Sequence, residues 1–363
     1  MKALKIGNLL AQLPIVQGGM GVGISMSRLA SAVANEGGVG VISAAGLGLV
    51  YKDYSPDFDK ATLWGLKEEI RKAREASRGK GGLIGVNIMV AMTNFANLVK
   101  TAISEKVDII FSGAGLPLSL PTFLTEGATT KLAPIVSSAR ALKVICRNWI
   151  GKYGYVPDAV VVEGPKAGGH LGFAREQIED PAYSLEQLVP EVVAAVREIE
   201  QEHGRKIPVI AGGGIYTGED IYNIMQLGAD GVQMGTRFVA TEECDASDGF
   251  KQAYIDAKEE DIELIQSPVG MPGRAIHNSF LQKVKEGLKH PKSCPFHCIK
   301  TCKVEESPYC IMTALFNAFR GQLEHGYAFC GSNAWRTERI MQVRELIEGL
   351  KEEFRSARAK FGE

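Results

Sequence analysis

The chain has no long hydrophobic run. Apolar stretches among its 363 residues are short and are broken by glycine, proline or charge, whereas a membrane-spanning helix needs about 20 consecutive apolar residues. Near the N-terminus, Gln12 and Pro14 interrupt the apolar stretch, so a signal peptide is not expected. The sequence therefore predicts a cytoplasmic protein without a membrane-spanning helix.

An excess of charge of either sign is also absent. Lysine and arginine total 41, aspartate and glutamate total 42, and the formal net charge is −1. The sequence pI is about 6.6, so no overall attraction to nucleic acid or to an anionic membrane is implied. The expected partner is a small-molecule substrate, and a homodimer stays open.

The seven cysteines lack the even number and the spread of a secreted disulfide framework. Four of them, Cys294, Cys298, Cys302 and Cys310, are candidate ligands for zinc or an iron–sulfur cluster, because both take soft thiolate ligands. Their gaps are not the paired two-residue gaps of zinc ribbons or ferredoxins, although the first three cysteines would share one helical face. The alternative is buried free thiols that pack a small helical lid on the barrel.

Eight short apolar runs, rich in β-branched residues, predict strands. Their hydrophobicity is continuous rather than alternating, which is typical of parallel strands that helices cover on both faces. Most of them begin about 25 residues apart, which leaves room for one helix and two loops. The runs are 14–17, 39–43, 83–88, 107–111, 132–136, 158–163, 207–211 and 231–234.

The segments between these runs carry apolar residues at steps of three and four, as amphipathic helices do. Examples are 26–37, 96–106 and 219–229. Eight repeats of strand and helix predict a (β/α)₈ TIM barrel, an α/β fold whose active site lies at the C-terminal ends of the strands. We expect this barrel over residues 1–240 and a helical, cysteine-containing extension over 241–363.

Two other α/β architectures compete with the barrel. GMGVG at 19–23 resembles a dinucleotide-binding fingerprint, but VISAAG at the end of the second strand lacks the acidic residue that such a site needs. An open, doubly wound sheet is the second competitor. The number of predicted strands favours closure.

Glycine loops follow the seventh and eighth predicted strands, in AGGGIYTGED at 211–220 and QMGTRF at 233–238. Barrels commonly bind phosphate at these two loops, where backbone amides can surround an anion. The phosphate could belong to FMN or to a sugar phosphate. Tight βα turns are the simpler explanation of each loop taken alone.

The sixth predicted strand runs into a glycine-rich turn with one histidine, DAVVVEGPKAGGHLG at 158–172. Glycines let a ligand approach the backbone closely, and the imidazole of His170 can transfer a proton near neutral pH. This pattern favours His170 as a catalytic residue over a solvated turn histidine.

Eight motifs in order resemble the nitronate monooxygenase family, formerly called 2-nitropropane dioxygenase, which includes flavin-dependent enoyl-acyl carrier protein reductases. The similarity spans about 14–281. It implies a (β/α)₈ barrel that binds FMN without a covalent bond. The motifs are PIVQGGMGVG, GGVGVIS, GVNIMV, SGAGLP, EGPKAGGHLG, PVIAGGGI, GADGVQMGTRFVAT and SPVGMPGRAIHNSFL.

The resemblance implies roles for individual residues. His170 matches the catalytic histidine of the family, as a base or electrostatic partner in the nitronate enzymes and as a proton relay or substrate-positioning group in the reductases. The cofactor-binding residues fall into three groups, beside the flavin ring, around it and at its phosphate. They are Gly19, Met20, Gly21 and Asn87; Glu163, Gly168 and Gly169; and Gly213, Gly214, Gln233, Met234, Gly235 and Thr236.

Two residues depart from the family pattern. Glu163 stands where the nitronate enzymes often carry glutamine, and Lys166 stands where both branches often carry glutamate. We therefore expect an FMN-dependent oxidoreductase that resembles nitronate monooxygenase, with an NAD(P)H-dependent enoyl-thioester or quinone reductase as the alternative. A sugar-phosphate enzyme without flavin is a further alternative.

Overall fold

Eight parallel strands close into a barrel, as the eight apolar runs predicted. The computed structural model describes residues 1–79, 81–291 and 293–360. Each barrel strand pairs with the next barrel strand along the described chain. The last strand, β11, pairs with the first, β3, with Val232 opposite Ile15, and this pairing closes the ring. The strands are β3 (Ile15–Gln17), β4 (Val39–Ser43), β5 (Leu83–Met89), β6 (Ile109–Gly113), β7 (Lys131–Val136), β8 (Val160–Glu163), β10 (Val209–Gly212) and β11 (Gly231–Met234).

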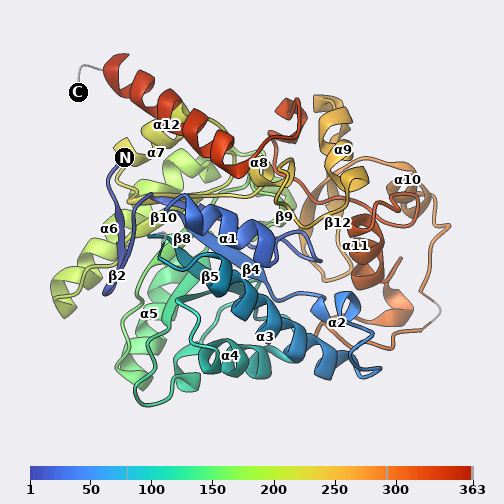
Figure 1. Cartoon of the computed structure of the whole chain (residues 1–363), viewed down its shortest axis with the longest axis horizontal. Coiled ribbons are helices and arrows are strands. Elements are labelled where there is room, and N and C mark those ends of the chain that lie inside the picture. Colours follow the sequence, from blue (N-terminus) through green and yellow to red (C-terminus); the bar gives the residue numbers. More distant parts are fainter. Residues whose placement is uncertain (80, 292, 361–363) are drawn as a thin grey trace.

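Helices follow the barrel strands and surround the barrel (Figure 1), except that in the described chain β6 is followed by a 3₁₀ turn, Leu120–Phe123, in place of an α-helix. Several begin at a side-chain cap: Asp57, Ser138 and Thr217 each accept a hydrogen bond from a backbone amide of the first turn. The barrel helices are α1 (Ser27–Asn35), α2 (Leu47–Val50), α3 (Phe58–Ala76), α4 (Phe95–Ser104), α5 (Ala139–Tyr153), α6 (Leu185–His203), α7 (Gly218–Gln226) and α8 (Thr236–Val239).

A hairpin that the apolar runs did not predict closes the barrel interior at the N-terminal ends of the strands. Strands β1 (Leu4–Ile6) and β2 (Leu9–Ala11) pair antiparallel. Leu4 and Ile6 are buried in one cluster with inward-facing barrel residues such as Val41 and Phe111. The hairpin therefore seals the end opposite the expected active site.

The C-terminal part contains the predicted helices and, in addition, a small antiparallel sheet. Strand β13 (Pro272–Ile276) pairs with β12 (Ile262–Gln266) on one side and with β9 (Gly169–His170) on the other. The sheet thus attaches the histidine turn to the extension. The helices are α9 (Asp248–Asp256), α10 (Ser279–Lys285), α11 (Ile311–Phe319) and α12 (Val343–Lys360).

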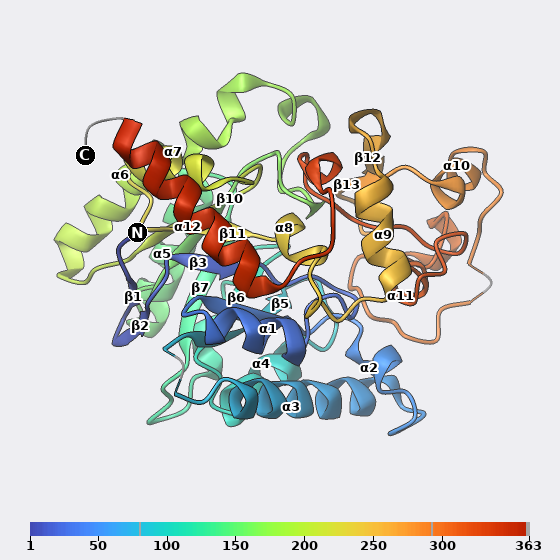
Figure 2. The ribbon, with the colours of Figure 1, turned by 45° about the horizontal axis from the view of Figure 1, so that its top comes forward.

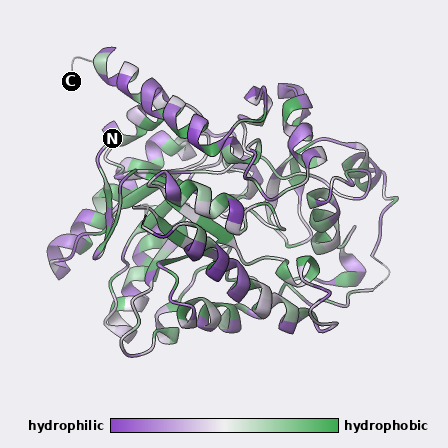
Figure 3. Ribbon diagram, viewed as in Figure 1, coloured by the Kyte–Doolittle hydropathy of each residue, from purple (hydrophilic) through white to green (hydrophobic). Residues whose placement is uncertain are grey.

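Helix α12 returns to the barrel and lies along α7 (Figure 2). Contact is close, because a Cβ at Gly218 would lie 2.2 Å from the carbonyl oxygen of Leu350. Apolar and polar residues alternate along α12 as on an amphipathic helix, and its Leu346, Ile347 and Leu350 are buried (Figure 3). Short 3₁₀ turns lie at Leu120–Phe123, Arg175–Gln177, Pro181–Tyr183, Glu259–Asp261, Val304–Glu306 and Ala334–Arg336.

The shared helical face predicted for the first three cysteines is wrong. Residues 294–302 form bends and turns rather than a helix. Pro295 follows Cys294 directly, and His297 has a positive φ of 43°, which a right-handed helix does not allow. Among the described residues, no helix is long and apolar enough to cross a membrane.

Candidate active site

A cavity of about 280 Å³ opens at the C-terminal ends of the barrel strands, under the C-terminal part of the chain. Barrel loops line one side, and residues of β9, α11 and the segment 327–333 line the other. All residues predicted to bind the cofactor, and His170, line this cavity. The structure therefore brings the predicted site together, while the role of each residue stays a prediction.

His170 lies on β9 at the cavity wall. Its Nε2 is 2.7 Å from Oγ of Ser267, and its ring packs edge to face on Phe329 with 4.9 Å between centroids. Burial lowers the pKa of His170 to about 4. The imidazole is therefore neutral near pH 7, held in place by a hydroxyl and an aromatic ring.

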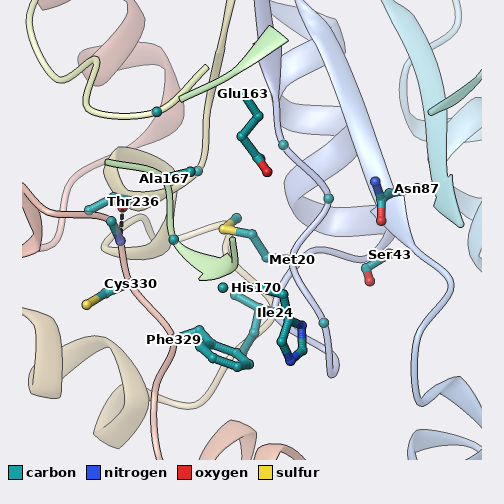
Figure 4. Close-up of a pocket in the computed structure, with 18 of the residues that line it drawn as sticks. Met20, Ile24, Ser43, Asn87, Glu163, Ala167, His170, Thr236, Phe329 and Cys330 are labelled. Atoms are coloured by element: carbon teal, nitrogen blue, oxygen red, sulfur yellow. Dashed lines mark hydrogen bonds between the residues drawn. The ribbon is translucent and has the colours of Figure 1, made fainter. Parts of the chain in front are cut away.

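Glu163 ends strand β8, and its side chain points into the cavity (Figure 4). Within the described part of the chain its carboxylate accepts no hydrogen bond and forms no ion pair, and burial raises its pKa to about 7. Since no cation or donor among those residues offsets this burial, the carboxyl group changes charge in the neutral pH range.

The two glycine loops at β10 and β11 form the end of the cavity that phosphate would occupy. Gly213 and Gly214 have positive φ values of 105° and 88°, and their amides donate no backbone hydrogen bond to any other described residue. A Cβ at Gly214 would lie 3.0 Å from Cβ of Lys166. This loop therefore lines the cavity with two amides that have no backbone acceptor among the described residues, and one lysine lies beside it.

The segment 330–333 covers these loops. The Gly331 amide donates to Oγ1 of Thr236 at 3.0 Å (Figure 4). The Asn333 side chain donates to the carbonyl oxygen of Gly214 at 2.7 Å. The Ser332 hydroxyl lines the cavity, is buried and has no hydrogen-bond partner among the described residues. An unpaired buried hydroxyl costs free energy unless a ligand pairs with it.

The loop after β3 approaches the ends of β4 and β5 closely enough to require glycine. A Cβ at Gly19 would lie 2.3 Å from Cβ of Asn87, and one at Gly21 would lie 2.9 Å from Oγ of Ser43. These two glycines therefore let the loop pack flat against Asn87 and Ser43.

Gly168 and Gly169, in the histidine turn, differ in what they require. A Cβ at Gly168 would lie 2.6 Å from the backbone of Cys330, so this glycine is needed for packing. Gly169 has a positive φ of 74°, and a Cβ there would meet no described atom within 4 Å, so it leaves space open. Space for a side chain is therefore closed at Gly168 and open at Gly169.

The comparison with known protein families decides the identity of this barrel. A family model described as nitronate monooxygenase matches residues 2–353. The chain belongs to the nitronate monooxygenase family. The family assignment makes it an oxidoreductase, and its match extends beyond the 14–281 region that carried the resemblance.

Individual relatives of this nitronate monooxygenase family member are distant. A probable nitronate monooxygenase of Staphylococcus aureus is 26% identical over 297 residues, covering 76% of this chain and 78% of the relative. A dehydrogenase of Mycobacterium tuberculosis, named for a hydroxy-methyl-oxo-octahydroindene-carboxyl-CoA, is 28% identical over 276 residues. That alignment covers 76% of this chain and 66% of the dehydrogenase, slightly less than two thirds of its length.

Solved structures agree on the fold. FabK from Thermotoga maritima superposes with a TM-score of 0.72 and 29% identity, covering 97% of this chain and 95% of FabK. A nitroalkane oxidase from Streptomyces ansochromogenes has the same TM-score of 0.72 at 22% identity, covering 96% and 98% of the two chains. The second likeness supports the barrel fold alone.

Sequence reasoning missed the cavity residues of the C-terminal part. Tyr327, Phe329 and Ser332 line the cavity, and Ser267 contacts His170 from outside its lining; all four lie far along the chain from most of the barrel motifs. Ser267 begins one of the family motifs, SPVGMPGRAIHNSFL, but nothing in that motif indicates contact with His170. The small polar residues around Gly331 were the one signal that could have indicated the covering segment.

The four candidate metal ligands do not line the cavity. Within residues 1–79, 81–291 and 293–360, no three histidine, cysteine, aspartate or glutamate side chains are arranged to hold a metal ion. Burial raises the pKa of the Cys298 thiol to about 12. A metal site at these residues stays a prediction.

Proposed function

We propose that the protein is an FMN-dependent oxidoreductase that handles its substrate beside His170. The observation that carries this proposal is one cavity that joins the two glycine loops of β10 and β11 to a buried, neutral imidazole. When bound, FMN would supply hydride and electron transfer at its ring. The predicted donor is NAD(P)H.

The phosphate end of the cavity fits the cofactor. The Gly213 and Gly214 amides have no backbone acceptor among the described residues, and the buried Ser332 hydroxyl has no partner there. Lys166 lines the same cavity and packs against Gly214. Amides, a hydroxyl and a lysine are the donors that an anionic phosphate requires.

The opposite end of the cavity fits a flat ring. Met20 lines it beside Gly19, whose lack of a side chain lets Asn87 lie against the loop. Figure 4 shows Asn87 and Ser43 on one side of the cavity and Thr236 and Cys330 on the other. The Asn87 amide would hydrogen-bond the edge of the flavin ring.

His170 would move a proton to or from the substrate. A neutral imidazole can accept a proton at one nitrogen, and Ser267 is within hydrogen-bond distance of Nε2. Phe329 packs on the ring and excludes water from that side. The residue therefore suits a proton relay and does not provide a fixed positive charge.

The charges of the cavity favour a substrate that is uncharged at its reacting end. Among the described lining residues Lys166 is the one lysine or arginine, and it packs on the phosphate loop. Glu163 adds negative charge above pH 7. We therefore infer reduction of an enoyl thioester or a quinone, and the similarity to a dehydrogenase named for a carboxyl-CoA substrate supports a thioester.

Oxidation of nitronates or of related nitro compounds is the second candidate. The family model is named for it, and the neutral His170 is able to take a proton from the carbon of an uncharged nitroalkane. A negatively charged nitronate fits less well, because no cation lies beside His170 in the described part of the cavity lining.

One experiment separates these candidates. The FMN-loaded protein is reduced by NADH or NADPH without oxygen and is then mixed with crotonyl thioester, a quinone or oxygen. Rapid reoxidation by the thioester or quinone supports the reductase. Oxygen consumption with propyl-2-nitronate and no NAD(P)H would instead establish the monooxygenase, and a colourless protein active on sugar phosphates would refute both.

The cytoplasmic location, the homodimer and the domain boundary at residue 240 stay predictions.

A further inference from the structure

Two arginine side chains lie over one tyrosine ring beside the phosphate end of the cavity. The tyrosine is Tyr216, which lines the cavity from the loop after β10. The guanidinium carbons of Arg237 and Arg336 lie 4.4 Å and 4.6 Å from the centre of its ring. Arg237 directly follows Thr236, and Arg336 ends a 3₁₀ turn just after the covering segment 330–333. The fold thus gathers two positive charges from distant parts of the chain.

Neither guanidinium has an acceptor in the described part of the chain. Arg237 and Arg336 form no ion pair there, and their side chains donate no hydrogen bond there. Nε of Arg237 is buried and unpaired, which is unusual because a buried N–H group is normally hydrogen-bonded. The carboxylate of Asp220, at the start of α7, instead accepts hydrogen bonds from the amides of Tyr216 and Thr217. Two positive charges therefore lie together without an anion.

Arginines that support the fold have their donors occupied in this protein. Nη1 of Arg274 donates to two backbone carbonyl oxygens, each at 2.7 Å. Arg205 also stacks on a tyrosine ring, but its guanidinium pairs with the buried carboxylate of Asp158 at 2.5 Å. Stacking on a ring holds Arg237 and Arg336 in place in the same way, yet it leaves their N–H groups unused. A purely structural role therefore does not account for this pair.

A phosphate group matches the donors that this pair leaves unused. Guanidinium groups bind phosphate oxygens through two parallel hydrogen bonds, and charge on both partners strengthens them. The residue before Arg336, Trp335, is 38% exposed and packs on no other aromatic ring of the described residues. An exposed indole face is a surface on which a nucleotide base can stack. Phosphate and base together indicate a nucleotide.

This phosphate is distinct from that of FMN. The FMN phosphate has donors of its own in the amides of Gly213 and Gly214 and in Lys166, all of which line the cavity. Among the described residues, Arg237 and Arg336 do not belong to the lining and touch only Tyr216 at its edge. The two sets of donors are therefore adjacent but separate.

We propose that Arg237 and Arg336 bind a phosphate group of a second nucleotide that reacts at the cavity. Two molecules of the proposed reaction carry such a group, namely NADPH with its 2′-phosphate and a coenzyme A thioester with its 3′-phosphate. The inference rests on the proposed function, because that function brings a nucleotide donor or a thioester to the flavin. It adds the site that recognises the phosphate.

The test is a calorimetric titration of the FMN-loaded full chain with three probes. Adenosine 2′,5′-bisphosphate stands for NADPH, adenosine 3′,5′-bisphosphate stands for coenzyme A, and adenosine carries no phosphate. We expect one bisphosphate to bind about tenfold tighter than adenosine or more, and R237Q and R336Q each to weaken that binding about tenfold. The bisphosphate that binds more tightly identifies the source of the phosphate.

Arg320 provides the matched control. It stacks on Phe316, 5.7 Å from the ring centre, is exposed and forms no ion pair with a described residue. R320Q therefore removes one stacked guanidinium without touching Tyr216, and it is expected to leave the Kd of both bisphosphates unchanged. Circular dichroism checks the fold of each variant, and R336Q carries the test if R237Q does not fold.

Three results overturn the proposal. The first is bisphosphate binding that is no tighter than adenosine binding, and the second is an unchanged Kd in R336Q. The third is loss of FMN from R336Q with bisphosphate binding unaltered, since the arginines then serve the FMN phosphate. FMN content is measured on the same samples. A wild-type protein that takes up no FMN refutes the proposed function instead, and the bisphosphate titration is then made on that protein without FMN.

Discussion

At the scale of single residues, the cavity contains two groups whose charge is set by burial. His170 is neutral because burial lowers its pKa to about 4, and Glu163 is half-protonated near neutrality because burial raises its pKa to about 7. Both lie in the same cavity without a salt-bridge partner among the described residues. Opposite shifts of this kind are typical of catalytic sites rather than of structural ion pairs.

Substitution of the histidine tests its assigned role. His170→Ala is expected to keep FMN bound and to lower kcat about 100-fold or more, because it removes the proton-transfer group but no phosphate contact. FMN content and steady-state turnover measure the two effects. The control His325→Ala, at an exposed site, is expected to change neither. Turnover that survives in His170→Ala would contradict the role given to this imidazole.

The pH dependence of stability tests Glu163. The folded state holds its proton up to about pH 7 while the unfolded chain releases it near 4.5, so stability falls as pH rises through that window. Glu163→Gln removes this loss. The difference in unfolding free energy between Glu163→Gln and the wild type should therefore grow in favour of the variant by up to about 3 kcal/mol from pH 4 to pH 8. Urea unfolding of FMN-free protein measures this difference.

The same substitution predicts a change in the pH profile of kcat. The kcat of the wild type should change near pH 7, where Glu163 loses its proton. The kcat of Glu163→Gln should lack this change and should decline only toward pH 4, where His170 becomes protonated. A stability difference that is constant with pH, or a kcat profile unaltered by the substitution, would show that Glu163 does not titrate as described.

At the scale of elements, the barrel depends on close strand–helix packing. Gly40 in β4 lies against α1: a Cβ there would be 1.8 Å from the carbonyl oxygen of Ala30. Gly40→Ala is expected to destabilise the fold by about 3 kcal/mol or more, since helix backbone has to move. Denaturant unfolding with far-UV circular dichroism measures the loss.

The matched control is the same substitution in an open position. Gly349 lies inside α12, and a Cβ there would meet no described atom within 4 Å. Gly349→Ala is expected to stabilise the protein by about 0.5–1 kcal/mol through helix propensity. Equal effects of the two substitutions on stability would show that close packing of β4 against α1 does not require a glycine at position 40.

Elements with strong internal patterns were predictable, and the others were not. The continuous apolar runs identified every barrel strand because parallel strands are buried on both faces. Strand β12 is mostly half-buried and β9 has only two residues, so neither leaves a run. The prediction that Cys294, Cys298 and Cys302 share one helical face was wrong because it rested on their spacing alone. It took no account of Pro295, which disfavours a helix there.

At the scale of the whole molecule, the site combines a predictable half with a half that was not predictable. Glycine loops at the strand ends leave a local signature, so the barrel side of the cavity could be read from sequence. The covering side comes from contacts between distant segments, such as His170 with Ser267 and Gly214 with Asn333. No local pattern specifies which distant residues meet, so these contacts needed the fold.

FMN binding would join these two halves and should stabilise the molecule as a whole. Ligand that binds only the folded state adds about 2.7 kcal/mol at 100 times its Kd. The protein stripped of FMN is expected to unfold at a lower temperature than the loaded protein, and added FMN should restore the difference. Thermal unfolding followed by circular dichroism measures this shift.

The most direct test of the flavin site is an equilibrium titration of the stripped protein with FMN, followed by flavin absorbance and fluorescence. We expect one FMN per chain, with binding weakened in Gly214→Val, because a side chain there would collide with Lys166 and block the phosphate loop. A protein that stays colourless and takes up no FMN at any concentration would contradict the central claim.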